Sequence, residues 1–77
     1  MISFEEAVKI AKQYKKNANT CIEYERGYSF GSTEDNDFVG GYGHEAIGIM
    51  KDDGRVLYMH SFIDADPGKQ IGDVMPI

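Results

Sequence analysis

One cysteine and two histidines are the residues of this sequence that are best suited to nucleophilic catalysis. Cys21, with either His44 or His60 as its general base, has the side chains of a thiol-dependent hydrolase. No spacing in the sequence brings them together, and a cysteine at the start of a strand is typically a small buried hydrophobic residue. We therefore predict that the protein is not an enzyme and keep a Cys21-dependent hydrolase as the least favoured alternative.

Three polar segments have the residue types of ligand sites but not the spacing. His44 and Glu45 are adjacent, so on a strand they point to opposite faces and cannot share a metal. Neither Asp64–Gly68 nor Glu34–Asp37 is followed by the glycine and glutamate of a calcium loop. The glycine-rich run 40–43 lacks the following Lys-Ser/Thr of a phosphate loop. We predict turns or loops at these places and no metal or cofactor.

The formal charge of −5 is unevenly distributed along the chain. Residues 1–20 have a net charge of +2, whereas residues 21–77 have a net charge of −7. Nucleic-acid binding needs clustered lysines and arginines, so this balance argues against a nucleic-acid partner. An acidic surface attracts basic proteins and speeds their capture.

Tyrosines suit protein interfaces because the ring buries area while the hydroxyl stays hydrated. Tyr42 and Tyr58 are the two that we expect at such a surface. The acidic residues Glu34, Asp35 and Asp37 lie in a polar turn region of the same acidic part of the chain. These five residues are our predicted partner-binding surface.

The size of the chain limits what can hold these residues in place. Seventy-seven residues predict one domain over 1–77, and one cysteine excludes an internal disulfide. No apolar run approaches the roughly 20 residues needed to cross a membrane, so no membrane contact is expected. The acidic start of the chain lacks the pattern of a secretion signal, and we expect a cytoplasmic protein.

The clearest predicted element is a helix over residues 4–17. Ser3 and Glu6 form the signature of a capping box at its start. Apolar residues recur at steps of three and four and form one stripe, namely Phe4, Ala7, Val8, Ala11, Tyr14 and Ala18.

The rest of the chain has the pattern of strands and turns. Residues 21–30 alternate, which predicts one long strand with a bulge at Gly27; a tight hairpin over Arg26-Gly27 is the alternative. The long strand would place four apolar residues on one face, Ile22, Tyr24, Tyr28 and Phe30.

A second hairpin is predicted from strands over 46–50 and 55–62. The turn has either two residues, Asp53-Gly54, or three residues with Gly54 in the left-handed conformation. We favour three residues, because this register gathers four aliphatic side chains on one face, Ile47, Ile49, Leu57 and Met59. The tail after Ser61 is expected to return to the sheet as a short strand or to pack as a coil.

The opposite face of this hairpin is not polar either. It would consist of Ala46, Gly48, Met50, Val56, Tyr58 and His60. Because one helix covers only one face of a sheet, a second copy of the chain could cover the other. The predicted fold is therefore α+β, with the N-terminal helix packed on a four-stranded antiparallel β-meander.

The order of these elements resembles the small bacterial immunity-protein family that includes YrhB-like domains, and more loosely the PepSY-like modules. The matching segments are Ser3–Ala7, Gly27–Phe30 and Ile47–Val56. The resemblance implies an α+β fold and a non-enzymatic protein that binds and blocks a cognate toxin, without catalytic residues.

Together, these observations predict a small acidic binding protein, such as an immunity or inhibitor protein, that captures a basic protein partner. The alternative is a structural homodimer that closes the second face of the sheet on itself.

Overall fold

The structure is a computed structural model that describes residues 1–33 and 46–77. The first helix, α1, spans Phe4–Tyr14. The predicted cap is confirmed, because the Glu6 N–H donates to Ser3 Oγ at 3.1 Å. The helix ends three residues earlier than predicted. Ala7 and Ala11 are buried as expected, but Tyr14 is 66% exposed and does not belong to the core stripe.

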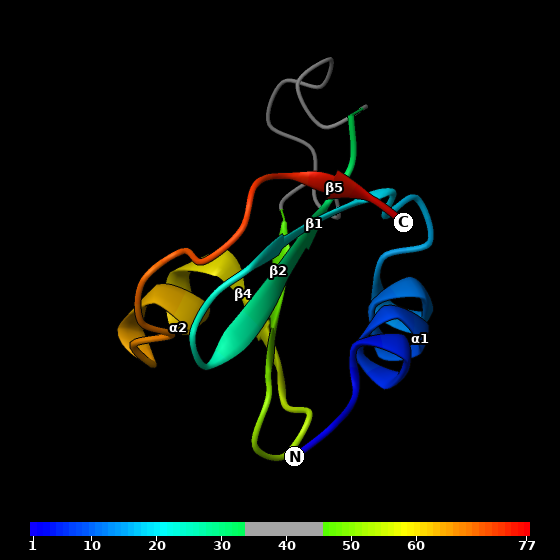
Figure 1. The fold of residues 1–77 in the computed structure, drawn as a ribbon. Coiled ribbons are helices and arrows are strands. Elements are labelled where there is room, and N and C mark those ends of the chain that lie inside the picture. The colour runs from blue at the N-terminus through cyan, green and yellow to red at the C-terminus, as the bar shows by residue number, and fades with distance from the viewer. Residues whose placement is uncertain (34–45) are drawn as a thin grey trace.

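In these two described ranges, five antiparallel strands form a single sheet with the order β4-β3-β2-β1-β5 (Figure 1). The predicted α+β fold with a meander is confirmed, although the structure adds a fifth strand and a second helix, α2 (Met59–Asp64). The strands are β1 (Thr20–Glu23), β2 (Gly27–Gly31), β3 (Ile47–Met50), β4 (Val56–Tyr58) and β5 (Met75–Pro76). Neither helix of the described part of the chain is long and apolar enough to span a membrane.

The prediction of one long strand through Gly27 is wrong. The chain reverses between β1 and β2, where the Tyr24 N–H donates to the Gly27 carbonyl at 2.8 Å. The turn is centred on Glu25 and Arg26, one residue before the alternative that we considered. In one continuous strand, residues of the same parity share a face. In this hairpin the odd-numbered residues of β1 lie opposite even-numbered residues of β2, so residues of opposite parity share a face.

This register determines which aromatic rings are buried in the core. Cys21 lies opposite Phe30, and both are fully buried, whereas Ile22 lies opposite Ser29 on the other face. The expected single face with Ile22 and Tyr28 together is therefore wrong.

The β3–β4 hairpin also differs from both predicted registers. Ile49 lies opposite Val56, and Ile47 lies opposite Tyr58. The loop has four residues, 51–54, because the Met50 N–H donates to the Arg55 carbonyl at 3.0 Å. Gly54 does adopt the predicted left-handed conformation, with φ of +76°. The extra loop residue moves Leu57 to the face opposite Ile47 and Ile49.

The predicted strand over 55–62 ends at Tyr58, and α2 replaces its second half. The reason is the packing of Phe62 against two glycines. An added Cβ would lie 2.1 Å from the Phe62 ring at Gly48 and 2.6 Å from it at Gly27. The Tyr24 ring meets the Phe62 ring edge-on at 5.6 Å. The absence of side chains at these glycines therefore lets α2 lie directly on the sheet.

The two helices cover opposite faces of the sheet (Figure 1). Gly48 and Met50 lie on the α2 face and are buried, whereas Val56 and Tyr58 lie on the α1 face. The expected single apolar face containing all four residues is therefore wrong. Of the residues that motivated the homodimer, Gly48 and Met50 are buried on the α2 face, whereas Tyr58 is exposed on the α1 face.

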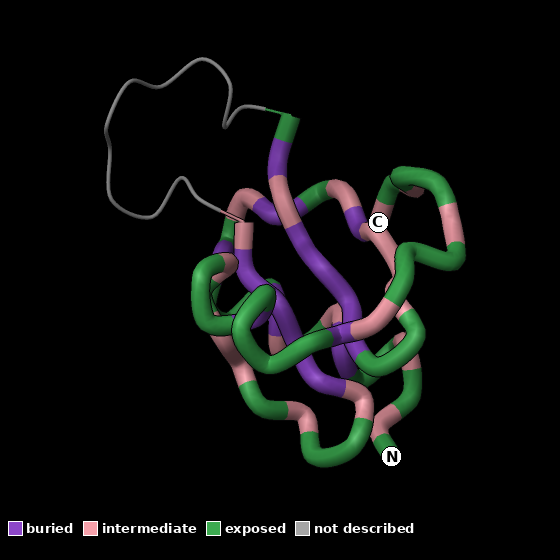
Figure 2. Tube along the Cα trace, turned by 90° about the vertical axis from the view of Figure 1, so that its left-hand side faces the viewer, coloured by how far each residue is buried: buried purple, intermediate pink, exposed green. Residues whose placement is uncertain are grey.

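The main core lies between α1 and the sheet, where the buried segments of β2 and β3 run side by side (Figure 2). Phe4 of α1 meets Tyr28 edge-on at 5.5 Å between ring centroids. At the border of this core the Lys51 ammonium lies 2.7 Å from Glu23 Oε2 and 5.0 Å from the centre of the Tyr28 ring. The core consists of Ala7, Ala11, Ala18, Cys21, Tyr28, Phe30, Ile47 and Ile49.

The tail returns to the sheet as a short strand, as one of our two expectations stated. β5 places Met75 opposite Cys21. Before it, the Arg26 guanidinium holds the turn at Asp66 through a 3.0 Å hydrogen bond to the carbonyl and a 3.3 Å ion pair. The carboxylate of this supposed calcium-loop fragment therefore pairs with an arginine.

Candidate functional site

Cys21 and His60 do not form a catalytic pair, because they lie on opposite faces of the sheet. Cys21 is fully buried in the α1-face core. His60 belongs to α2 on the opposite face, and its side chain is 93% exposed, with Nε2 3.7 Å from Asp64 Oδ2. His44 lies outside the described residues. Burial, with a smaller contribution from the Glu23 carboxylate, raises the pKa of the Cys21 thiol to about 11.

This raised pKa predicts a loss of stability at alkaline pH. Between pH about 9 and about 11 the unfolded chain has lost the Cys21 proton while the folded protein still holds it. The free energy of unfolding should therefore fall as the pH rises through this window, by roughly 2–3 kcal/mol at most. Urea denaturation at several pH values measures the slope. The slope of the unfolding free energy against pH should be shallower in Cys21→Ala. An identical slope in both proteins would contradict the raised pKa of the Cys21 thiol.

No three His, Cys, Asp or Glu side chains of residues 1–33 and 46–77 gather closely enough to hold a metal ion.

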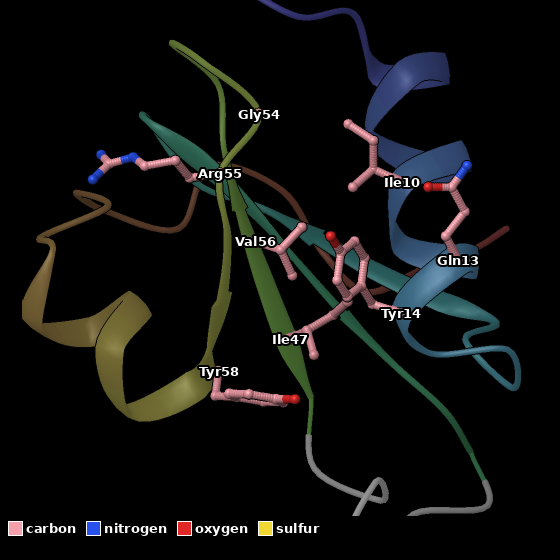
Figure 3. Close-up of a pocket in the computed structure, with 8 residues that line it drawn as sticks. All are labelled: Ile10, Gln13, Tyr14, Ile47, Gly54, Arg55, Val56 and Tyr58. Carbon is pink, nitrogen blue, oxygen red and sulfur yellow. The ribbon is translucent and has the colours of Figure 1, made fainter.

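A groove of about 460 Å³ lies between α1 and β4 on the α1 face of the sheet (Figure 3). Its α1 wall and its sheet side are mainly apolar or aromatic. The residues that line it are Ile10, Gln13 and Tyr14 from α1, Ile47, Val56 and Tyr58 from the sheet, and Gly54 and Arg55 before β4.

The register of the sheet explains why Tyr58 is exposed at this groove. Cys21, Phe30, Ile47 and Tyr58 form one row across four strands, with their side chains on the α1 face. The first three are buried, whereas Tyr58 is 67% exposed at the end of the row. Among the residues predicted to bind a partner, Tyr58 is the one that the structure describes, and its ring is accessible.

Tyr14 is a groove residue that the sequence pattern did not identify. It belongs to the apolar stripe of α1 by spacing, but the helix ends at this residue, and its ring extends between α1 and Val56 (Figure 3). Two exposed tyrosines therefore line one groove. This combination depends on how far α1 reaches across the sheet, which helix periodicity does not reveal.

The groove contains no unpaired charge among the described residues that line it. The one charged side chain among these described lining residues is Arg55, whose Nε lies 2.9 Å from Asp53 Oδ2. The backbone N–H of Arg55 also donates to Asp53, and this bond is the largest cause that lowers the pKa of the Asp53 carboxyl. The groove is therefore suited to an uncharged or apolar part of a ligand.

Most of the net charge of the protein comes from the segment between β2 and β3. Residues 34–45 contain four carboxylates, Glu34, Asp35, Asp37 and Glu45, and no lysine or arginine. The other 65 residues carry nine acidic side chains against eight basic ones and are almost neutral. The predicted contact residues Glu34, Asp35, Asp37 and Tyr42 belong to this segment and lie outside the described residues.

The described residues show where this charged segment joins the sheet. Ala46, which follows it, precedes Ile47, and Ile47 lies opposite Tyr58. The groove thus ends beside the point where the segment joins β3.

A second set of exposed apolar side chains lies on α2 and the tail, namely Ile63, Ile71 and Val74. The acidic residues beside this set are fewer, namely Asp64, Asp66 and Asp73, and Asp66 is paired with Arg26. We therefore regard the groove as the stronger candidate.

Comparison of the sequence with protein families, with curated proteins and with solved structures finds no match.

Proposed function

We propose that this protein is a small acidic binding protein that captures a basic protein partner, as an immunity or inhibitor protein does. The observation that carries the proposal is the position of Tyr58. It is an exposed tyrosine in an apolar groove, one strand away from the junction with a segment of four carboxylates and no basic residue.

The two parts of this surface have different roles in the proposed mechanism. The carboxylates of Glu34, Asp35 and Asp37 attract a basic surface from a distance and raise the rate of encounter. The rings of Tyr42 and Tyr58 then supply apolar contact area, and tyrosine is enriched among the residues that dominate binding energy. The same acidic charge argues against a nucleic-acid partner.

The surroundings of the cysteine support binding over catalysis. Cys21 is buried beneath α1, and its thiol holds its proton at neutral pH, so it is a poor nucleophile. A single free thiol also suits a reducing compartment, and we propose that capture occurs in the cytoplasm.

The proposal is tested by mixing the purified protein with each protein that is encoded beside it. We expect one of them, carrying a net positive charge, to form a complex at micromolar concentration that weakens as salt is added. If none of these proteins binds at that concentration, the proposed function is wrong. Light scattering of the protein alone tests the homodimer, because a monomer at every concentration excludes it.

A further inference from the structure

Among the described residues, the outer side of β4 is an open sheet edge. Within residues 1–33 and 46–77 no strand pairs with that side. The other edge strand, β5, has only two residues, and one of them is Pro76, which has no N–H to offer. β4 is longer, with three residues and no proline, so it is the edge at which a further strand can be added.

The hydrogen-bond pattern shows which groups β4 offers. Met50 and Arg55 form a hydrogen-bonded pair, with the Met50 N–H donating to the Arg55 carbonyl at 3.0 Å. Pairs alternate along an antiparallel ladder, so Val56 and Tyr58 belong to the non-hydrogen-bonded positions facing β3. The Val56 N–H and carbonyl and the Tyr58 N–H therefore point outward from the sheet.

The groove lies on the face toward which the side chains of these same two residues point. Residues directly opposite each other in an antiparallel pair direct their side chains to the same face. A residue added opposite Val56 or Tyr58 would therefore place its side chain in the groove, toward Ile10 and Tyr14. The intervening residues of the added strand would point to the other face.

We propose that the basic partner binds by adding an extended segment to the β4 edge as an antiparallel strand, with alternate apolar side chains in the groove. This binding mode rests on the proposed function and specifies its partner as an extended segment that alternates basic and apolar residues. The charge complementarity comes from the net charge of −5, which favours a basic segment. Backbone hydrogen bonds would supply affinity, and the groove would select the apolar side chains.

The test uses three capped eight-residue peptides that alternate lysine and valine. One is unmodified, one is N-methylated at every valine, and one is N-methylated at every lysine. The valines enter the groove, so their N–H groups face β4, whereas the lysine N–H groups face solvent. We expect the valine-methylated peptide to bind at least about tenfold more weakly than the unmodified one, and the lysine-methylated peptide to bind as the unmodified one does.

A pair of protein variants provides an independent readout. Val56→Pro removes the outward N–H without breaking a hydrogen bond to β3, and edge strands tolerate proline at such a position. Val56→Thr keeps both the N–H and the branched shape of the side chain. The unmodified peptide should bind Val56→Pro at least about tenfold more weakly than it binds Val56→Thr, which keeps the N–H. Circular dichroism is used to check that both variants fold.

Each contrary result identifies which proposal fails. Equal binding of all three peptides, or no effect of Val56→Pro, overturns the edge pairing. In that case, peptide binding that still disappears when the four carboxylates of residues 34–45 become amides would support the proposed capture by charge without the edge pairing. If no peptide binds at millimolar concentration, the edge pairing is wrong, and the mixing experiment alone decides the proposed function.

Discussion

Replacing Gly48 with alanine is expected to lower the free energy of unfolding by about 3 kcal/mol, near the upper end of overpacking costs. The new methyl group would lie 2.1 Å from Cδ1, 2.2 Å from Cγ and 2.8 Å from Cβ of Phe62. These atoms are near the helix backbone rather than at a flexible end, so α2 itself must move. Urea denaturation followed by circular dichroism measures the loss.

Two comparisons isolate the cause of this loss. Gly72→Ala is the matched control, because its nearest neighbour is Glu23 Cβ at 4.0 Å, and its effect should stay within about 0.5 kcal/mol. Gly48→Ala should also cost much less in a Phe62→Ala background, where the clash is absent. An equal cost in both backgrounds would show that Phe62 does not pack over Gly48.

Converting the four carboxylates of residues 34–45 to amides is expected to slow partner association by ten- to a thousandfold at low salt. These positions hold most of the net charge of −5, so the attraction that precedes contact should be almost lost. The variant is Glu34→Gln, Asp35→Asn, Asp37→Asn and Glu45→Gln. Stopped-flow mixing with the basic partner measures the association rate as a function of salt.

A variant with the same change in net charge provides the control. It carries Glu5→Gln, Glu6→Gln, Asp64→Asn and Asp73→Asn, all at exposed positions far from residues 34–45 in the sequence. Association should slow much less in this variant. Equal slowing by both variants would mean that total charge governs capture and would contradict a local acidic surface.

The parts of the fold that depend on local chemistry could be predicted from the sequence. Ser3 starts α1 because its hydroxyl accepts the Glu6 N–H, and this bond involves only neighbouring residues. Gly54 occupies a left-handed position because glycine adopts it without a steric cost. Such features are independent of the rest of the molecule.

Strand register could not be predicted as well, because a turn shifted or lengthened by one residue inverts every face that follows. Both hairpins were affected in this way. The turn at Glu25 and Arg26 separated Ile22 from Tyr28, and the four-residue loop before Arg55 separated Leu57 from Ile49. Alternation alone cannot distinguish these registers, because both faces of the sheet carry apolar residues.

The second helix and the groove depend on contacts between distant parts of the chain. Residues 59–62 continue the strand pattern, and their helical form depends on the docking of Phe62 against Gly27 and Gly48. Tyr58 was expected to be accessible because tyrosine suits protein interfaces, and its side chain is exposed. Tyr14 was assigned to the core, because the extent of α1 over the sheet is a property of the packed molecule.

In the proposed mechanism, the partner contacts the groove and the adjoining acidic segment. The most direct test is to record the amide NMR spectrum of the isotope-labelled protein while the basic partner is added. We expect the largest shifts at Tyr14, Val56, Tyr58 and residues 34–45, with little change in α2. Shifts concentrated at Ile63, Ile71 and Val74 instead would place the partner on the opposite face and contradict the account.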